Sequence, residues 1–511
     1  MDIFAFVLYF VAMVAVGIYF FFKSKDVTEK DYFLGGRSMG PWVTAMSAQA
    51  SDMSAWLLMG LPGSILAFGF GQAWIGIGLA IGTAANWILV AKRLRKFSKA
   101  SGDAITLPQY LSNRFASKSH TVSIICAVVF LVCFTIYVAS AFVAGADVFT
   151  TLVPQLPRAT AMIIFAAIVV VYTFLGGFNA VCWTDFFQGL LMLAALLIVP
   201  IVVGFTKNLD TAALTTVYEG PNGEKFEFVA TFFNASWKDV VSGLGWGLGY
   251  FGMPHIIVRF MAIEKPSMVK KSATVAIIWV VLSLAATVVI AYFGRMFVYS
   301  NGIDLSATLL AEGKQSLIFV ELARDVFPAF IAGILLAAII AASMSTADSQ
   351  LLVAASSFSS DLYKPLIRKN ATNKEMIWVS RAIVMVIAVI AYFIASSKGK
   401  AAQAIMDLVS NAWGIFGAAF GPVVLLSLFW KRFTYKGAVA GIVVGAVVDM
   451  LWLWLPVSGG LALTAVTGIY EIIPGFILGG IVSIIVTLID KAPSQEVEAI
   501  YAAATDNSID D

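Results

Sequence analysis

A carboxylate stands in the middle of a segment that is otherwise hydrophobic enough to cross a membrane. The segment SAQASDMSAWLLMGLPGS covers residues 47–64 and contains Asp52. Placing a charged side chain at the centre of a bilayer costs at least about 2.5 kcal/mol, so membrane proteins that keep one usually use it or shield it. Two roles are open for Asp52. It either attracts a cation or caps the backbone N–H groups of a broken helix.

Hydroxyl side chains recur at helical spacing in a second segment, AAIIAASMSTADSQLL. Ala342, Ser345, Thr346 and Ser349 lie at positions i, i+3, i+4 and i+7, which places them on one face of a helix. Together with backbone carbonyls freed by an unwound helix, such oxygen atoms suit a small hard cation such as sodium. The same side chains also suit hydrogen bonds to the preceding turn or between helices, and the spacing alone favours neither role.

Two hydrophobic segments carry residues that interrupt a helix. Gly60, Pro62 and Gly63 follow Asp52 in the first segment, and the second, SGLGWGLGYFGMPH, is rich in glycine before Pro254. Unwound backbone within a membrane is tolerated only where it lines a cavity or is buried in protein, so we expect both breaks to face an interior site. The alternative is that the glycines only permit close packing of helices.

Composition predicts an all-α integral membrane protein. Of 511 residues, 60% are hydrophobic and 12% are charged, against about 25% charged in a typical soluble domain. Apolar stretches of about twenty residues predict thirteen spans. They lie near 3–22, 40–67, 70–91, 121–150, 160–176, 183–206, 239–257, 272–298, 325–356, 377–397, 404–430, 437–456 and 469–489. Interrupted spans two and seven are five helices apart, which predicts an inverted repeat of spans 2–6 and 7–11.

Charge patterning predicts the orientation of the chain. Most Lys and Arg residues fall in alternate loops, so the positive-inside rule makes that side cytoplasmic and the N-terminus external. Residues 1–490 form one transmembrane domain, followed by a polar cytoplasmic tail, 491–511, expected to be mobile. The net charge of +3 argues against a nucleic-acid partner, and Cys126, Cys133 and Cys182 are expected to be packing residues.

Several long motifs resemble the sodium:solute symporter family. They are YFLGGRSMGPWVTAMSAQASDMSAWLLMGLPG (32–63), YTFLGGFNAVCWTDFFQG (172–189), GLGWGLGYFGMPHIIVRF (243–260), ILLAAIIAASMSTADSQLL (334–352) and SSDLYKPL (359–366). The resemblance covers nearly the whole chain. It implies a multi-pass transporter in the cell membrane, in bacteria the inner membrane, with the thirteen-helix, five-plus-five arrangement of the amino-acid transporter LeuT.

The resemblance also implies ion-binding residues. Its sodium site corresponds here to the backbone carbonyls of Ala50, Met53 and Ala342 and the hydroxyls of Ser345 and Thr346. Asp52 lies between two of these carbonyls, where its charge would favour sodium. A second ion site, present in some members only, would use Asp185 with Ser345, Asp348 and Ser349. A carboxylate at position 348 would strengthen that site, bind a proton or pair with a buried donor.

For proline-transporting members, the resemblance implies a pocket for L-proline. The matching residues are Ser54, Trp56, Tyr137, Trp246, Tyr250 and Pro254. Aromatic faces suit the cationic amine and the apolar ring of proline, and its carboxylate suits free N–H groups at a half-helix end. Ala55 replaces a glycine expected in proline carriers, so another amino acid, a monocarboxylate or pantothenate is the alternative substrate. Arg37 is expected to form a cytoplasmic gate contact or to snorkel to the interface.

Other classes of membrane protein fit the sequence less well. A channel would more typically show a short selectivity filter or rings of charge. The GIGLAIG run (76–82) mimics part of a dinucleotide fingerprint, yet it lies in an apolar span and is assigned to helix packing rather than to an enzyme site. No signalling domain or obligate protein partner is evident, and membrane lipid is the expected environment.

Overall fold

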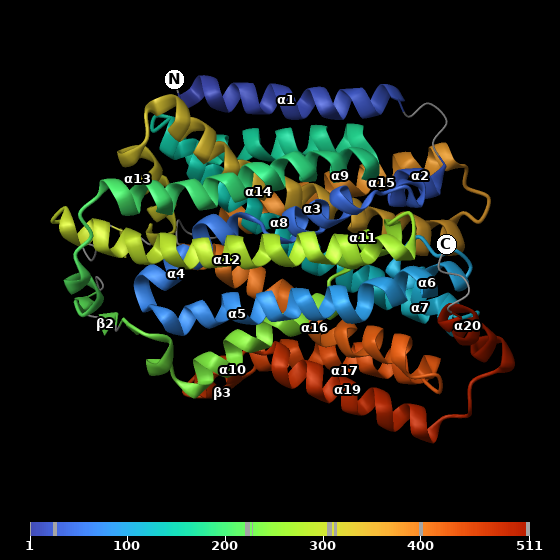
Figure 1. The fold of residues 1–511 in the computed structure, drawn as a ribbon. Coiled ribbons are helices and arrows are strands. Elements are labelled where there is room, and N and C mark those ends of the chain that lie inside the picture. The colour runs from blue at the N-terminus through green and yellow to red at the C-terminus, as the bar shows by residue number, and fades with distance from the viewer. Residues whose placement is uncertain are drawn as a thin grey trace.

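The computed structural model describes residues 2–23, 28–219, 225–226, 228–303, 309–310, 314–397 and 402–506. Most of these residues are helical, and the helices run side by side along one direction (Figure 1). Within the described residues, nine helices are long and apolar enough to cross a membrane. Shorter apolar helices at Ile3–Tyr19, Trp56–Phe68 and Arg158–Phe174 coincide with further predicted spans.

The first half of the chain contains one interrupted helix and one sharply bent helix. Its elements are α1 (Asp2–Lys23), α2 (Glu29–Leu34), η1 (Gly35–Arg37), α3 (Pro41–Asp52), η2 (Trp56–Gly60), α4 (Leu61–Phe68), α5 (Phe70–Ala85), η3 (Asn86–Ala91), α6 (Lys92–Ala100), α7 (Leu107–Arg114), α8 (Thr121–Leu152) and α9 (Arg158–Thr206). Gly177 in α9 has φ 60° and ψ −176°, a conformation that favours glycine, and it divides α9 where the sequence predicts two spans.

The segment between α9 and the second interrupted helix is short and irregular. It contains η4 (Thr211–Leu214), β1 (Tyr218–Glu219), β2 (Lys225–Phe226) and η5 (Phe232–Asn234). The two strands are antiparallel, with Tyr218 opposite Phe226.

The second half repeats the pattern of a broken helix followed by long helices. Its elements are α10 (Trp237–Gly245), η6 (Trp246–Phe251), α11 (Pro254–Ala262), η7 (Pro266–Met268), α12 (Val269–Ser300), η9 (Gln315–Leu317), α13 (Ile318–Val326), α14 (Ala329–Ser356), η10 (Ser357–Ile367), α15 (Asn373–Ser397), α16 (Ala402–Phe429), α17 (Tyr435–Trp454), β3 (Pro456–Ser458), β4 (Leu461–Ala462), α18 (Leu463–Thr467), α19 (Ile472–Ile489) and α20 (Gln495–Thr505).

Both predicted interruptions are present. Helix α3 ends at Asp52, and Met53 leaves the helical region with φ −81° and ψ 78°. The second break is at Gly252 and Met253, after which Pro254 occupies the first turn of α11, where its missing N–H has no helical partner to lose. Residues Trp246–Phe251 form a 3₁₀ helix rather than an α-helix.

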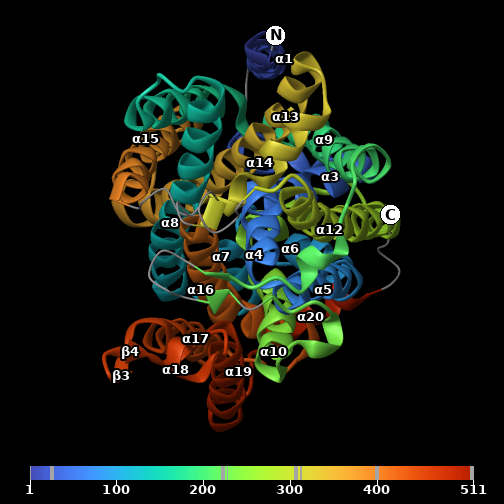
Figure 2. The same ribbon diagram turned by 90° about the vertical axis from the view of Figure 1, so that its left-hand side faces the viewer.

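Helix α14 occupies the centre of the molecule. It packs against α8, α9 and α1, and almost every residue from Ala332 to Ser356 is buried. Viewed along the helices, α1 lies at one edge and α17 and α19 lie at the opposite edge (Figure 2). The polar face of α14 therefore lies inside protein rather than in lipid.

The glycines of the GIGLAIG run serve helix packing, as the sequence predicts. A Cβ on Gly78 would collide with the carbonyl oxygen of Gly243, and one on Gly82 would lie 2.5 Å from Cα of Gly247. Helix α5 thus packs directly against the backbone of α10 and η6, the second interrupted helix. Cys126, Cys133 and Cys182 are free and buried, in agreement with a packing role.

The expectation of a mobile tail is wrong for residues 495–505, which form α20. The Ser494 hydroxyl accepts the N–H of Val497 and caps the helix. The Tyr501 ring packs edge-on against Phe97 of α6, with ring centroids 5.3 Å apart, so apolar contact holds α20 against α6. Residues 507–511 of the predicted tail lie outside the described part of the chain.

Candidate ion and solute site

The hydroxyl face of α14 meets the broken end of α3. The Ser345 Oγ lies 2.7 Å from the carbonyl oxygen of Ala50 and 3.2 Å from that of Ala342. The buried Thr346 Oγ1 has no hydrogen-bond partner, and Met53 is fully buried at the break. An oxygen-rich position therefore lies where a helix has lost its own hydrogen bonds, which is the environment that a desolvated cation requires.

Asp52 connects the two interrupted helices. Its Oδ2 accepts a hydrogen bond of 2.5 Å from the Tyr250 hydroxyl, while its Oδ1 is buried without a partner. The indole N–H of Trp56 donates to the Asp52 backbone carbonyl at 3.3 Å. The carboxylate is thus held by a side chain of η6, and one of its oxygens has acceptor capacity left over.

An arginine lies among the residues implied for a second ion site. Arg259 of α11 contacts Asp185 Oδ2 through Nη2 at 3.1 Å and donates from the same nitrogen to the Ser349 hydroxyl at 2.5 Å. Ser47 bridges the pair, donating to Asp185 at 2.7 Å and accepting from Arg259 at 3.1 Å. Ser349 in turn lies 3.3 Å from Asp348. All five side chains are buried, so a fixed cation balances one of the two acids.

Arg259 was not expected at this position. It lies two residues beyond the predicted end of span seven, at 257, where an arginine resembles one that snorkels to the interface. Its guanidinium is nevertheless buried, because it bonds to Ser47, Asp185 and Ser349 of the surrounding helices α3, α9 and α14. A local signal exists in IIVRF, where apolar residues flank the charge on both sides.

Aromatic side chains form a wall beside the second break. Trp246 stacks on Tyr470 with ring centroids 5.0 Å apart, and Tyr250 meets Trp413 edge-on at 5.1 Å. The Trp413 indole N–H donates to the Trp246 carbonyl at 2.8 Å. Trp246 and Tyr250 thus both contact Trp413, although the helix that carries them is a 3₁₀ helix. Trp413 and Tyr470 were missed because they come from α16 and from the residues just before α19, whose packing against η6 leaves no local sequence pattern.

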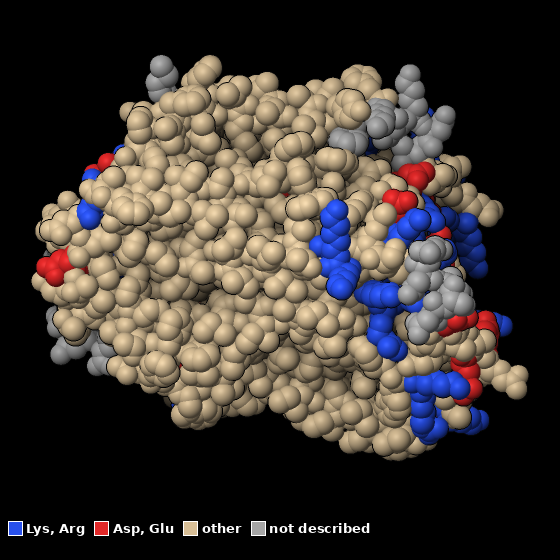
Figure 3. All heavy atoms as spheres, in the orientation of Figure 1, with Lys and Arg blue, Asp and Glu red and all other residues tan. Residues whose placement is uncertain are grey.

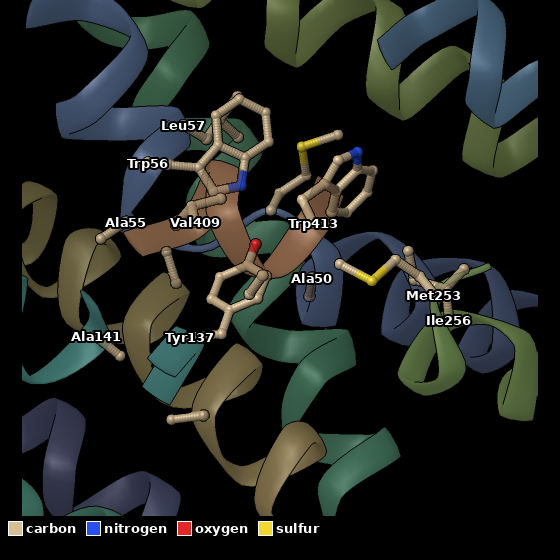
Figure 4. Close-up of a cluster of buried hydrophobic side chains, with 14 of the residues drawn as sticks. Ala50, Ala55, Trp56, Leu57, Tyr137, Ala141, Met253, Ile256, Val409 and Trp413 are labelled. Carbon is tan, nitrogen blue, oxygen red and sulfur yellow. The ribbon is translucent and has the colours of Figure 1, made fainter. Parts of the chain in front are cut away.

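The remaining residues implied for a substrate pocket surround the first break. Ser54 is buried and accepts the N–H of Trp56 at 3.4 Å, whereas the buried Tyr137 hydroxyl has no partner. In Figure 4 the Tyr137 hydroxyl points toward the part of the cluster that holds Trp56 and Trp413. Pro254 begins α11 on the far side of the second break. Aromatic walls and an unpartnered hydroxyl suit a small amphipathic solute.

Arg37 holds together the ends of several elements. Its guanidinium donates to Asp103 at 2.8 Å, to the Ser98 hydroxyl at 3.0 Å, and to the carbonyls of Ala104 and Met261 at 2.8 and 2.5 Å. Its backbone has φ 56°, which is strained for a residue with a side chain and points to a functional constraint. The contacts join η1, α6, the α6–α7 loop and α11.

Asp103 also forms an ion pair with Lys30, so two cations contact one carboxylate. Although partial burial opposes the change, the hydrogen bond from Lys30 and the charge of Arg37 hold the pKa of Asp103 below its usual value of 3.8. The carboxylate therefore stays ionised throughout the physiological pH range.

Comparisons with known proteins agree with these features. The sequence model of the sodium:solute symporter family matches residues 32–445. The sodium/proline symporter of Escherichia coli is 42% identical across 98% of this chain and 95% of its own length, and the high-affinity proline transporter PutP of Bacillus subtilis is 42% identical across 95% and 97%. A solved sodium-coupled sialic acid symporter shares the fold, with a TM-score of 0.76, 21% identity, and coverage of 97% of this chain and 99% of that chain.

Proposed function

The chain belongs to the sodium:solute symporter family, and we propose that it carries L-proline into the cell together with sodium by alternating access. It is a multi-pass membrane transporter, not an enzyme, and sodium is its coupling ion. Proline as the substrate is supported by relatives named proline symporters or transporters that match nearly the whole chain at 41–42% identity.

One contact carries the sodium part of the proposal. The 2.7 Å approach of the Ser345 hydroxyl to the Ala50 carbonyl joins α14 to the end of α3, and Ala342, Met53 and Thr346 complete the set of oxygens. Sodium bound there would bind to both elements at once, so its presence or absence would change how α14 and α3 fit together. Asp52 lies between Ala50 and Met53 and adds a negative charge near the ion.

The solute is proposed to bind between the two breaks. Trp246, Tyr250 and Trp56 offer aromatic faces to a cationic amine and an apolar ring. The Tyr137 hydroxyl and the Ser54 hydroxyl are donors suited to a carboxylate. Proline has no polar side chain, so these contacts satisfy all of its polar groups.

The position of Arg259 is relevant to the number of sodium ions transported with each proline. A guanidinium within hydrogen-bond distance of Asp185 and Ser349 supplies a fixed positive charge where a second sodium would bind. We therefore assign one sodium to each proline. Asp348 remains near this cation through Ser349 and acts as part of the same polar network.

The proposed architecture has thirteen crossings. Helices α3–α9 and α10–α16 would form the two five-helix repeats, with α1, α17 and α19 outside them, because each half starts with an interrupted helix. The two chain ends lie at opposite ends of the bundle (Figure 1), and Lys and Arg gather at the end that carries the C-terminus (Figure 3). This supports an external N-terminus and a cytoplasmic C-terminus.

Uptake into proteoliposomes tests the function directly. Labelled L-proline should accumulate under an inward sodium gradient and should not accumulate when choline replaces sodium and only a proton gradient is imposed. Unlabelled alanine, pantothenate and acetate should compete more weakly than unlabelled proline. If one of them competes better, Ala55 has reshaped the pocket and the substrate assignment fails while the sodium coupling stands.

The number of sodium ions is tested by measuring charge flux against proline flux. Charge flux should equal one elementary charge per proline, and two would contradict the role assigned to Arg259.

A further inference from the structure

A positively lined cavity lies at the cytoplasmic end, away from the ion and solute site. It measures about 210 Å³ and lies between α6, the loop that follows α11, and α20. Arg95, Lys96, Lys99 and Lys265 line it, opposed by Glu264 and Asp506. The cations outnumber the acids, so the cavity attracts an anion.

One buried donor in this cavity has no partner. Arg95 is only 5% exposed, and its Nε and Nη2 donate to the carbonyls of Ile263 and Glu264 at 2.6 and 2.9 Å. Its Nη1 is buried without a hydrogen bond. Arg95 therefore holds the loop at Ile263 and Glu264 against α6 and adds its positive charge to the wall of the cavity.

The helix that carries these basic residues is apolar on its membrane side. Ile88 and Leu89, at 67% and 45% exposure, lie in η3, which continues directly into α6, eight and seven residues before Lys96. Hydrocarbon contact followed by basic side chains is the arrangement that fits a lipid with an anionic headgroup. A free phosphate would use the basic residues alone.

We propose that this cavity binds a phosphate group supplied by the headgroup of an anionic phospholipid of the cytoplasmic leaflet. The bound phosphate connects α6, the 263–265 loop and α20. That loop is continuous with Met261, whose carbonyl accepts from Arg37, so the lipid stabilises the closed cytoplasmic side of the transporter.

Lipid binding to the purified full-length protein tests the proposal without relying on transport. Native mass spectrometry would compare the fraction bound to phosphatidylglycerol with that bound to phosphatidylcholine. Thermal stability would be measured with each lipid, with inorganic phosphate and with glycerol 3-phosphate. The pocket variant is Lys96→Gln with Lys99→Gln and Lys265→Gln. The control variant removes equal charge outside the cavity through Lys270→Gln, Lys271→Gln and Lys369→Gln.

The expected result is preferential binding of phosphatidylglycerol that falls about tenfold or more in the pocket variant and changes little in the control. Lys99 is exposed, so Lys99→Gln alone keeps the fold and should reduce binding by several fold. Equal losses in the two triple variants would overturn the proposal, because general surface attraction would then explain the binding. Equal stabilisation by inorganic phosphate and by the lipid would overturn the assignment to a lipid.

Discussion

The Tyr250 hydroxyl lies 2.5 Å from Oδ2 of Asp52, so a hydrogen bond joins the two interrupted helices at their breaks. Because Asp52 is close to the proposed sodium ligands and Tyr250 belongs to the aromatic wall, this bond would connect the proposed ion site to the proposed solute site. Such a connection provides a physical route by which sodium organises the proline pocket.

Replacing Asp52 or Tyr250 should distinguish the effect of the negative charge from the effect of the hydrogen bond. Asp52→Asn removes the negative charge and should raise the sodium concentration for half-maximal uptake by about tenfold or more, equivalent to about 1.4 kcal/mol. Tyr250→Phe keeps the charge and should weaken proline affinity more than sodium affinity. Sodium titrations of uptake at fixed proline, and the reverse, measure both. Identical sodium curves for wild type and Asp52→Asn would rule out the electrostatic role.

Trp246→Ala should weaken proline binding while sodium binding measured without proline is preserved. Loss of the aromatic face removes a cation–π attraction of about 0.5–2 kcal/mol, or roughly two- to thirtyfold in affinity. Trp237→Ala is the matched control, since Trp237 begins the same half-helix but is 66% exposed. Equal proline affinities in the two variants would mean that Trp246 does not contact the substrate.

The buried Arg259–Asp185 pair should show strong energetic coupling. Arg259→Gln or Asp185→Asn alone leaves a buried charge unbalanced and should destabilise the protein by about 3–5 kcal/mol. The double variant should lose much less than the sum, as unfolding measurements in detergent would show. The exposed pair of Lys431 and Glu498, 3.1 Å apart, is the control and should contribute about 0–1 kcal/mol. Additive losses at Arg259 and Asp185 would show that the pair does not act as a unit.

The sequence predicted the two helix breaks and the hydroxyl-bearing face of α14 more fully than the rest of the site, for a physical reason. Ser345 and Thr346 stand at helical spacing in one segment, and the breaks near Asp52 and Pro254 are marked by glycine and proline, so local patterns are sufficient. Trp413 and Tyr470 reach the site from distant helices. Their contact with Trp246 depends on tertiary packing, which no local pattern encodes.

Arg259 and α20 were also not predicted from local sequence patterns, and both lie at the ends of elements. Arg259 was missed because hydropathy ends the seventh span at residue 257, and because its partners Asp185 and Ser349 come from α9 and α14, which no pattern near Arg259 indicates. Helix α20 was missed because residues 491–511 are polar in composition, and the apolar contact of Tyr501 with Phe97 depends on where α6 ends.

The cytoplasmic gate should depend on Asp103 and be insensitive to physiological pH. Asp103→Asn removes the acceptor shared by Lys30 and Arg37, so a reporter cysteine at the buried Ala262 should react faster with a thiol reagent from the cytoplasmic side. Asp490→Asn, which breaks a separate cytoplasmic pair with Lys436, is the control.

The lowered pKa of Asp103 fixes the sign of the pH effect. Its contribution to closure is present above the unfolded value of 3.8 and is lost as pH falls through the folded value below that. Labelling should therefore stay constant between about pH 8 and pH 5. Faster labelling on acidification within that range would contradict the assignment of the gate to Asp103.

The most direct test of sodium binding between α14 and α3 is the sodium dependence of proline uptake in three serine and threonine variants. Ser345→Ala and Thr346→Ala each remove one proposed ligand. Ser343→Ala removes a hydroxyl from the same helix that only bonds back to the Ile339 carbonyl at 3.0 Å. We predict that the half-maximal sodium concentration rises about tenfold or more in the first two and stays unchanged in the third. Unchanged sodium dependence in Ser345→Ala and Thr346→Ala would contradict this site.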